Sequence, residues 1–385
     1  MNTAVMPAAR GHLAQVFAQY PFEVLSGEDV WISTGDGRRI LDCYGGHAVA
    51  ALGYGHPRWL GALERQARSI AFQTNAVPMA VRERAARRLV EFSGLALDTV
   101  FFVNSGAEAN ENALKLACLQ TGRTEVLALE HGWHGRTAAA AAVTWGARDK
   151  WYGFPRTPFD VRFISRSDPT AAEAISERTA CVIVEPVQGL AGAYPVPTPL
   201  LSALRRRCTE HGALLIFDEV QCGVGRTGLP FAALRAGITP DMITTAKALG
   251  AGFPVAALLL APAVADRLKL EQLGTTFGGG PLACALVETV IDVIESEQLL
   301  ENVVRVSDYI ARTCQVGPVT GIQGEGFLLG LKLTRPAREV QRELLSRGIF
   351  AGGAADPNIL RLLPAYTFGE AHVALLAQAL SEIAP

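Results

Sequence analysis

TVFFVNSGAEANENALKLA, residues 99–117, joins an apolar run directly to a helical pattern. The first five residues have the length and composition of a buried strand, and Ser105 with Glu108 three residues later is the signature of a capping box, which begins a helix. The same alternation continues outward along the chain in EVLALE (125–130), TACVIVEP (179–186), the helical LLSALRRRCTEHG (200–212), ALLIFDE (213–219), DMITTAK (241–247) and VAALLLA (255–261). This rhythm predicts an α/β fold with a mostly parallel central sheet, because strands that are apolar throughout are typical of sheets covered on both faces.

The C-terminal part of the chain repeats this alternation on a smaller scale. A long helical pattern over residues 282–300 leads to a second α/β stretch. This stretch is made of GFLLGLKL (326–333), the helical AREVQRELLSRG (337–348), the strand-like NILRLLPA (358–365) and a final helix from Glu370. We therefore expect an N-terminal segment at 1–45 that packs with a small domain, a large domain at 46–285, and the small α/β domain itself at 286–385.

Composition and charge limit the classes of partner. The chain has 385 residues with 35 Lys plus Arg against 37 Asp plus Glu, and its net charge of −2 argues against nucleic acid or an acidic membrane surface. Its seven cysteines are scattered and never spaced Cys-x-x-Cys, which favours neither a disulfide framework nor a structural zinc site. No apolar run approaches the roughly 18 residues that a membrane span needs. We expect a cytoplasmic protein that acts on small molecules without a metal.

Polar residues follow several predicted strands, at the edge where open α/β sheets bind their ligands. Ser105 and Gly106 begin a helix whose free N–H groups suit a phosphate, although a capping box also serves a helix alone. Asp218 and Glu219 end another strand. A P-loop ATPase carries acids at such a strand end, but no lysine of this chain directly follows a glycine, so the phosphate-binding motif is missing. A buried, hydrogen-bonded structural aspartate is the other interpretation.

Lys247 follows the strand-like DMITTA and has the apolar neighbours Ala246, Ala248 and Leu249. Burial disfavours the charged form of a lysine and so increases the share of neutral amine, which can attack a carbonyl and form a Schiff base. A solvated surface lysine is the ordinary alternative. The apolar neighbours favour the buried amine.

The loop around Trp133 contains two histidines, His131 and His134, but no third ligand has a matching spacing, so zinc is weakly supported. Trp133 beside Arg136 makes better sense as a flat surface for a ring next to a carboxylate clamp. GVGRTG (223–228) matches the dinucleotide-binding motif Gly-x-Gly-x-x-Gly in sequence. The match is weak, because the segment does not lie in a tight turn from strand to helix.

A phosphate cradle, an aromatic plate, an acid, a lysine and arginines together meet the requirements of pyridoxal phosphate (PLP) chemistry. At this point the chain resembles the class III aminotransferases of PLP fold type I, and within them it is most similar to the acetylornithine aminotransferases. The resemblance extends from about Tyr20 to the last helix. It rests, in the order typical of the family, on YGGHAVAALGYGHP (44–57), NSGAEANENALKLA (104–117), HGWHGRT (131–137), EPVQG (185–189), FDEVQCGVGRTG (217–228), AKALGAGFP (246–254), TTFGGGPLACA (275–285) and LRLLPA (360–365).

The resemblance implies which residues hold the cofactor. Lys247 would form the Schiff base with PLP and, once freed, move a proton to and from the substrate, while Asp218 would pair with the protonated pyridine nitrogen. The further cofactor contacts that the resemblance implies are Ser105, Gly106, Ala107, Trp133, Gln221 and, from the partner in a homodimer with shared active sites, Thr276.

For the substrate, the resemblance implies that Arg136 binds the α-carboxylate of acetylornithine and that Arg361 binds the second carboxylate of 2-oxoglutarate or glutamate. Thr275 and Tyr20 would lie near the substrate. One departure from the family concerns Arg361. The glutamate that commonly masks this arginine is replaced by Leu190, which favours substrates with a carboxylate near the reacting carbon.

The function that follows is transfer of the terminal amino group of N-acetylornithine to 2-oxoglutarate, giving N-acetylglutamate semialdehyde and glutamate in arginine biosynthesis. Alternative donors are ornithine, succinylornithine, a carrier-bound lysine, a 4-aminobutyrate-like amine or an α-amino acid. Two other classes stay open: a nicotinamide-dependent dehydrogenase, which rests on GVGRTG alone, and a protein that binds PLP without catalysis.

Overall fold

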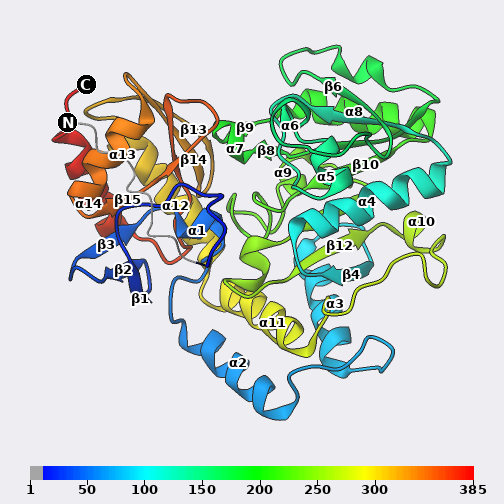
Figure 1. The fold of residues 1–385 in the computed structure, drawn as a ribbon, viewed down its shortest axis with the longest axis horizontal. Helices are drawn as coiled ribbons and strands as arrows, with labels where there is room; N and C mark the ends of the chain where they lie inside the picture. Colours follow the sequence, from blue (N-terminus) through cyan, green and yellow to red (C-terminus); the bar gives the residue numbers. More distant parts are fainter. Residues whose placement is uncertain (1–11) are drawn as a thin grey trace.

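The computed structural model describes residues 12–385, so residues 1–11 of the predicted N-terminal segment lie outside the described part. Two groups of sheets and helices lie side by side, the larger on the right of Figure 1 and the smaller on the left. The larger group is built on one sheet of seven strands. In spatial order these are β4 (Thr99–Val103), β12 (Ala256–Leu260), β11 (Met242–Thr245), β10 (Leu214–Asp218), β7 (Thr179–Val184), β5 (Glu125–Leu129) and β6 (Asp160–Ile164).

The seven-stranded sheet is parallel except for one strand. β10 pairs in parallel with β11 and β7, and β5 pairs in parallel with β7 and β6. β12 runs antiparallel between β11 and β4. The prediction of a mostly parallel sheet is therefore confirmed. The direction of β12 was not predictable, because an apolar run carries no information on strand polarity.

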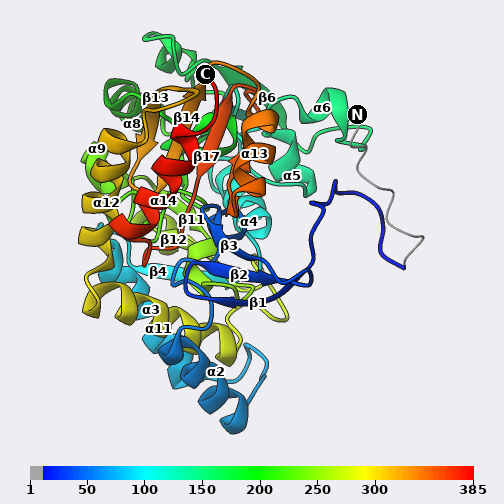
Figure 2. The ribbon, with the colours of Figure 1, turned by 90° about the vertical axis from the view of Figure 1, so that its left-hand side faces the viewer.

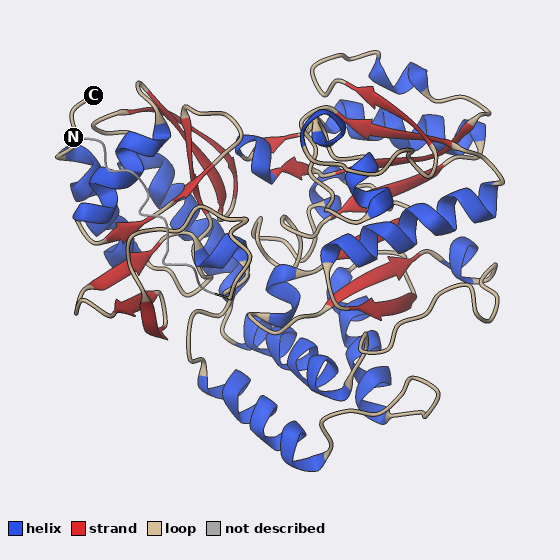
Figure 3. Ribbon diagram, viewed as in Figure 1, coloured by secondary structure: helices blue, strands red, loops and turns tan. Residues whose placement is uncertain are grey.

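Helices cover both faces of this sheet, which explains why most residues of its central strands are apolar (Figure 3). The helix α4 (Gly106–Thr121) packs in one core cluster with Val126 and Ile183. The helix α8 (Thr198–His211) packs in another with the adjacent strand residues Leu127 and Val182. Because successive side chains of a strand point to opposite faces, the two clusters lie on the two sides of the sheet.

The smaller group contains two four-stranded sheets. One orders β13 (Val319–Glu325), β14 (Leu328–Leu333), β17 (Ile359–Leu362) and β16 (Gly352–Gly353). The other orders β1 (Val24–Glu28), β2 (Trp31–Thr34), β3 (Arg39–Asp42) and β15 (Ile349–Phe350). The N-terminal strands thus share a sheet with a strand from the far end of the chain, which supports the predicted packing of the N-terminal segment. The exact domain limits stay a prediction.

Three helices accompany these sheets: α12 (Leu299–Thr313), α13 (Ala337–Ser346) and α14 (Glu370–Ser381). α13 contacts β16 and β17, α12 contacts α14, and Figure 2 shows α13 and α14 toward the viewer. Below both groups, α11 (Pro281–Ser296) packs against α2 (Pro57–Ser69) and α3 (Ala80–Ser93). The single helix predicted over 282–300 is wrong at its end, because Gln298 adopts a left-handed φ of 53° and separates α11 from α12.

The remaining elements are short. They are α1 (Gly45–Ala48), α5 (Ala138–Ala142), α6 (Ala147–Lys150), α7 (Gly189–Gly192), α9 (Ala233–Ala236), α10 (Pro262–Ala265), the 3-10 helices η1 (Ala171–Ala174) and η2 (Lys247–Gly250), and the strand pair β8 (Val187–Gln188) and β9 (Tyr194–Pro195). Across residues 12–385, no helix has both the length and the apolar character needed to cross a membrane.

Candidate active site

The carboxyl ends of the parallel strands open onto one cavity of about 740 Å³. Nine of the residues predicted to form the site line it: Ser105, Gly106, Ala107, Trp133, Arg136, Asp218, Gln221, Lys247 and Arg361. They come from segments that are far apart in the sequence, which the strand order brings to one edge of the sheet. Side chains that the prediction did not assign to the site also line this cavity, namely His47, Asn110, His134, Glu185 and Leu190.

The first element of the site is the beginning of α4. Ser105 Oγ accepts the backbone N–H of Glu108 at 3.2 Å, and Glu108 Oε2 accepts that of Ser105 at 3.3 Å, so the predicted capping box is present. The next two N–H groups, of Gly106 and Ala107, make no hydrogen bond within residues 12–385. Together with the positive end of the helix dipole, they suit an anion in the cavity.

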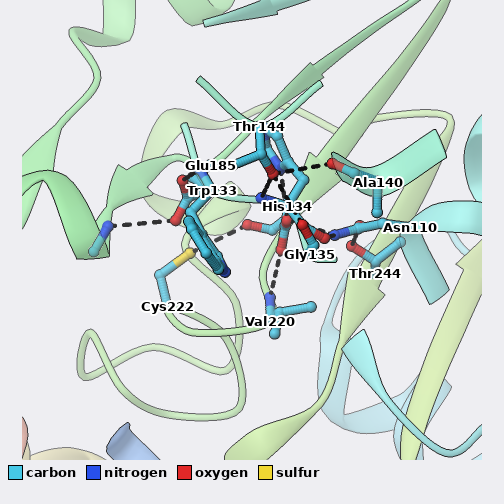
Figure 4. A network of polar contacts seen from close by, with 12 residues as sticks. Asn110, Trp133, His134, Gly135, Ala140, Thr144, Glu185, Val220, Cys222 and Thr244 are labelled. Carbon is cyan, nitrogen blue, oxygen red and sulfur yellow. Dashed lines mark hydrogen bonds and ion pairs between the residues drawn. The ribbon is translucent and has the colours of Figure 1, made fainter. Parts of the chain in front are cut away.

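Asp218, at the end of β10, is held by three donors and is only 2% exposed. His134 Nδ1 and Asn110 Nδ2 each donate to Oδ2 at 2.7 Å, and the backbone N–H of Val220 donates to Oδ1 at 3.0 Å. Figure 4 shows Asn110, His134 and Val220 converging in this network, with Thr244 donating to Asn110 Oδ1 at 2.6 Å. The carboxylate therefore has one fixed orientation in the wall of the cavity.

Lys247 begins the short helix η2, two residues after β11 ends, in a left-handed conformation with φ of 47°. Burial lowers the pKa of its amine, and the positive charge of Arg361 adds to this effect. The carboxylates of Asp218 and Glu185 act in the opposite direction. A larger share of neutral amine at neutral pH is what a nucleophilic or proton-accepting lysine requires.

The loop after β5 presents an aromatic surface. Trp133 lines the cavity, and its ring lies 5.5 Å from that of Trp151. The guanidinium of Arg136 lies 5.0 Å from the Trp133 ring and 4.5 Å from the Trp151 ring. These contacts orient an exposed arginine that lines the cavity, where it can bind a carboxylate.

The two histidines of the same loop serve different neighbours. His134 binds Asp218, whereas the ring of His131 lies 5.5 Å from that of Trp145. Within residues 12–385, no group of three or more His, Cys, Asp or Glu side chains is arranged to hold a metal ion.

Arg361, on β17, reaches the cavity from the smaller group of sheets and is 2% exposed. Its guanidinium donates to the carbonyl of Gly353 at 2.6 Å, to that of Gly189 at 3.2 Å and to the Tyr44 hydroxyl at 2.9 Å. All three acceptors are neutral. Within the described residues the charge of Arg361 has no ion-pair partner, and Leu190, which lines the same cavity, carries no charge.

Three predicted residues do not line this cavity. Tyr20 lines a neighbouring hollow, and its ring packs edge-on against Phe350 at 4.8 Å. Thr275 Oγ1 accepts from the Gly278 N–H at 3.1 Å and contacts the Asn104 amide at 3.5 Å. Thr276 is exposed, and the site predicted for it belongs to a partner subunit. The roles of these residues stay predictions.

Gln221 lines the cavity and packs against Gly189 so closely that a Cβ at Gly189 would lie 1.8 Å from Gln221 Oε1. Its Nε2 donates to the carbonyl of His47 at 3.4 Å. The predicted hydrogen bond from Gln221 to a ring hydroxyl of the cofactor stays a prediction.

Asn110 and Tyr44 carry functional contacts that the sequence analysis did not single out. Asn110 lies one helical turn after Gly106, so it shares the face of α4 on which the predicted phosphate-binding N–H groups lie. This spacing was the available signal for Asn110. For Tyr44 no comparable signal exists, because its hydrogen bond to Arg361 joins residues more than 300 positions apart.

The GVGRTG segment and Glu219 have structural roles. Arg226 is fully buried and donates to the carbonyls of Phe327, Pro364 and Ala48, so this segment is a strap between the two groups of sheets rather than a dinucleotide loop. Glu219 accepts the N–H groups of Ala232 and Ala233 at 2.6 and 2.8 Å. Burial raises the pKa of Glu219 to about 7.

Comparison with known proteins agrees with this geometry. Residues 14–384 match the family described as Aminotransferase class-III. The chain is 39% identical to an acetylornithine aminotransferase of Mesorhizobium japonicum, over 94% of this chain and 93% of the relative. It is 40% identical to one of Streptomyces coelicolor, over 94% and 90%. Among solved structures, it is similar to N-acetylornithine aminotransferase from Stenotrophomonas maltophilia, with a TM-score of 0.81 and 29% identity over 94% of this chain and 95% of that one. The ornithine aminotransferase from Toxoplasma gondii gives a TM-score of 0.90 with 26% identity, over 96% and 92%.

Proposed function

The chain belongs to the class III aminotransferases, and from this premise we propose that it transfers the terminal amino group of N-acetylornithine to 2-oxoglutarate. The products are N-acetylglutamate semialdehyde and glutamate. The observation that carries the proposal is the presence of Lys247, Arg136 and Arg361 on the wall of one cavity. An amine-transfer site that alternates between these substrates needs one lysine and two separate carboxylate-binding groups.

The protein is a PLP-dependent aminotransferase, and its described residues fit this cofactor. The free N–H groups of Gly106 and Ala107 suit the phosphate, the fixed carboxylate of Asp218 suits a protonated ring nitrogen, and Trp133 offers an aromatic face. When bound, PLP supplies an electron sink that eases loss of a proton from the carbon that bears the amino group.

Different residues of the chain bind the cofactor, move the proton and bind the substrate. Lys247 would hold the cofactor through Nζ in the resting site, and once the substrate amine has displaced it, its neutral amine would accept a proton from the amine-bearing carbon of the substrate. Asp218 keeps a negative charge at the ring nitrogen, and Asn110 and His134 hold that carboxylate in position. Arg136 binds the α-carboxylate of N-acetylornithine, so that the terminal amine points inward.

We infer a cytoplasmic homodimer that acts in arginine biosynthesis. Acetylornithine aminotransferase is the printed name of several relatives, and this name supports the pathway. The aromatic pair of Phe72 and Phe277, whose ring centres lie 5.3 Å apart, is exposed beside Thr276, and such a surface favours burial against a second subunit. Thr276 of the partner would then contribute to the cofactor site.

The proposal is tested by turnover. Purified protein with PLP is supplied with 2-oxoglutarate and one donor at a time: N-acetylornithine, ornithine, succinylornithine or 4-aminobutyrate. We expect the highest kcat/KM with N-acetylornithine, and a roughly 10- to 100-fold rise in its KM in Arg136→Gln, because a lost charge-assisted hydrogen bond is worth about 1.5–3 kcal/mol. A tenfold preference for another donor would overturn the donor assignment and leave the reaction class intact.

One observation favours a second candidate, an α-amino acid as the main donor. Among residues 12–385 Arg361 has no ion pair, so it is available to a carboxylate close to the reacting carbon. The same assay decides between the two candidates when alanine and aspartate are added to the panel. Faster turnover of either than of N-acetylornithine would favour the α-amino acid.

A further inference from the structure

Glu185 is a buried carboxylate of the cavity wall that the proposed mechanism leaves without a task. It follows β7 directly and is 6% exposed. Its Oε1 accepts the Trp133 N–H at 2.8 Å, and its Oε2 accepts the Gly189 N–H at 3.4 Å. Both donors are neutral. An ionised carboxylate in such a place is costly unless a positive charge lies close by.

Arg361 is in the complementary situation. It is a buried cation whose three hydrogen bonds all go to neutral oxygens, and within residues 12–385 it has no ion pair. The guanidinium therefore carries into the same cavity a charge that none of its hydrogen-bond partners neutralises. Burial accordingly lowers the pKa of Arg361, while the negative charge of Glu185 opposes that change.

Gly189 connects the two groups. Its N–H donates to Glu185 Oε2, and its carbonyl accepts from Arg361, so the two charges lie on either side of a single residue. The next residue, Leu190, also lines the cavity but carries no charge. Glu185 is thus an acidic group that is linked to Arg361 through the two backbone hydrogen bonds of Gly189.

We propose that Glu185 is the counter-charge of Arg361 in the resting cavity and takes up a proton from solvent when a substrate carboxylate binds Arg361. The step is a protonation of the Glu185 carboxylate, and no other bond forms or breaks. The inference rests on the proposed function in one respect, because it requires that Arg361 receives a carboxylate. Its consequence is that binding of a dicarboxylate is coupled to proton uptake.

The surroundings of Glu185 support a titration near neutral pH. Burial raises the pKa of Glu185 to about 7, and the charge of His134 counteracts part of this rise. Asp218 raises the pKa further. The other titratable or charged groups that interact with Glu185 or with Arg361 are Lys247 on η2, Cys222 after β10, Tyr44 and His47 around α1, and Tyr20 in the N-terminal segment.

The sign of the pH dependence follows from the charges. A carboxylate bound to Arg361 cancels the attraction that favours ionised Glu185, so the pKa of Glu185 is higher in the complex than in the free site. The complex therefore holds more protons, and its affinity falls as pH rises above about 7. A single linked proton limits this fall to about tenfold in Kd per pH unit.

Isothermal titration of the holoenzyme with glutarate tests the coupling, because glutarate carries two carboxylates and no amine to transfer. The titration is run at pH 7.5 in phosphate and in Tris, which differ in ionisation enthalpy, so the difference in heat gives the protons taken up. We expect an uptake of about 0.3–0.9 proton in the wild type. We expect no uptake in Glu185→Gln, and recovery of uptake in Glu185→Asp.

His47→Gln is the matched control, because His47 also lines the cavity and interacts with Arg361. Uptake that persists in Glu185→Gln, that disappears in His47→Gln, or that is absent in the wild type would overturn the inference. The two proposals fail separately. Turnover of N-acetylornithine without linked proton uptake refutes only the role of Glu185, whereas proton-linked glutarate binding without that turnover refutes only the donor assignment.

Discussion

Replacement of Asn110 by Ala tests whether the network around Asp218 stabilises the fold. The change removes a hydrogen bond to the Asp218 carboxylate and one to the His134 carbonyl, and it leaves the Thr244 hydroxyl without its acceptor. A hydrogen bond to a charged group contributes about 1.5–3 kcal/mol and a neutral one about 1 kcal/mol. We therefore expect a loss of about 3–5 kcal/mol in the free energy of unfolding.

The assay is thermal unfolding of the protein without added cofactor, so that weaker cofactor binding does not add to the effect. A chain of 385 residues has an unfolding entropy of about 0.8 kcal/mol/K, and the expected fall in Tm is about 4–6 °C. Asn112→Ala is the control, because half-buried Asn112 lies on the same helix and donates only to the Glu108 carbonyl. If Asn110→Ala melted within about 1 °C of Asn112→Ala, the network would not stabilise the fold, and the reasoning would be refuted.

Three further changes test other parts of the structure. Lys247→Ala is expected to lower the rate of glutamate formation by at least roughly 10²–10⁴-fold with an unchanged circular dichroism spectrum, and activity within tenfold of the wild type would contradict the mechanism. Because burial raises the pKa of Glu219 to about 7 from 4.5, its contribution to stability is fully present below about pH 4.5 and is lost as pH rises through 7. Glu219→Gln should thus show a smaller fall in Tm between pH 5 and 7.5 than the wild type. The exposed control Glu64→Gln should show the same fall in Tm as the wild type. If Glu219→Gln also showed the wild-type fall, the result would argue against this role. Arg226→Ala should lose about 3–5 kcal/mol, seen as a fall of about 4–6 °C in Tm, since three carbonyls lose a buried donor; a Tm within about 1 °C of the wild type would show that the strap is dispensable.

Much of the large sheet was predictable because its signal is local. A short apolar run coincides with each of the strands β4, β5, β7, β10 and β11. The capping box of Ser105 and Glu108 marks the beginning of α4. Properties that depend on distant partners were not predictable. The antiparallel direction of β12 is one example, and the break between α11 and α12 at Gln298 is another, because no glycine or proline marks it.

The candidate site divides in the same way. Residue types with distinctive chemistry at strand ends, such as Asp218 and Lys247, were found from the sequence alone. The residues that hold charged groups of the site were not, because Asn110 acts on Asp218 and Tyr44 on Arg361 through hydrogen bonds to partners more than 100 positions away. An amide or a phenol gives no sign of its partner until the fold brings the two together.

The sheet shared by the two ends of the chain has a consequence for synthesis in the cell. β3 pairs in parallel with β15, through Leu41 with Ile349 and Asp42 with Phe350, across about 300 residues. At roughly 5–20 residues per second, a ribosome needs about 15–60 s to make the intervening chain. During that interval the edge of β3 lacks its partner, so the nascent protein must reach nearly full length before this sheet closes, and an unpaired strand edge is a place where chains aggregate.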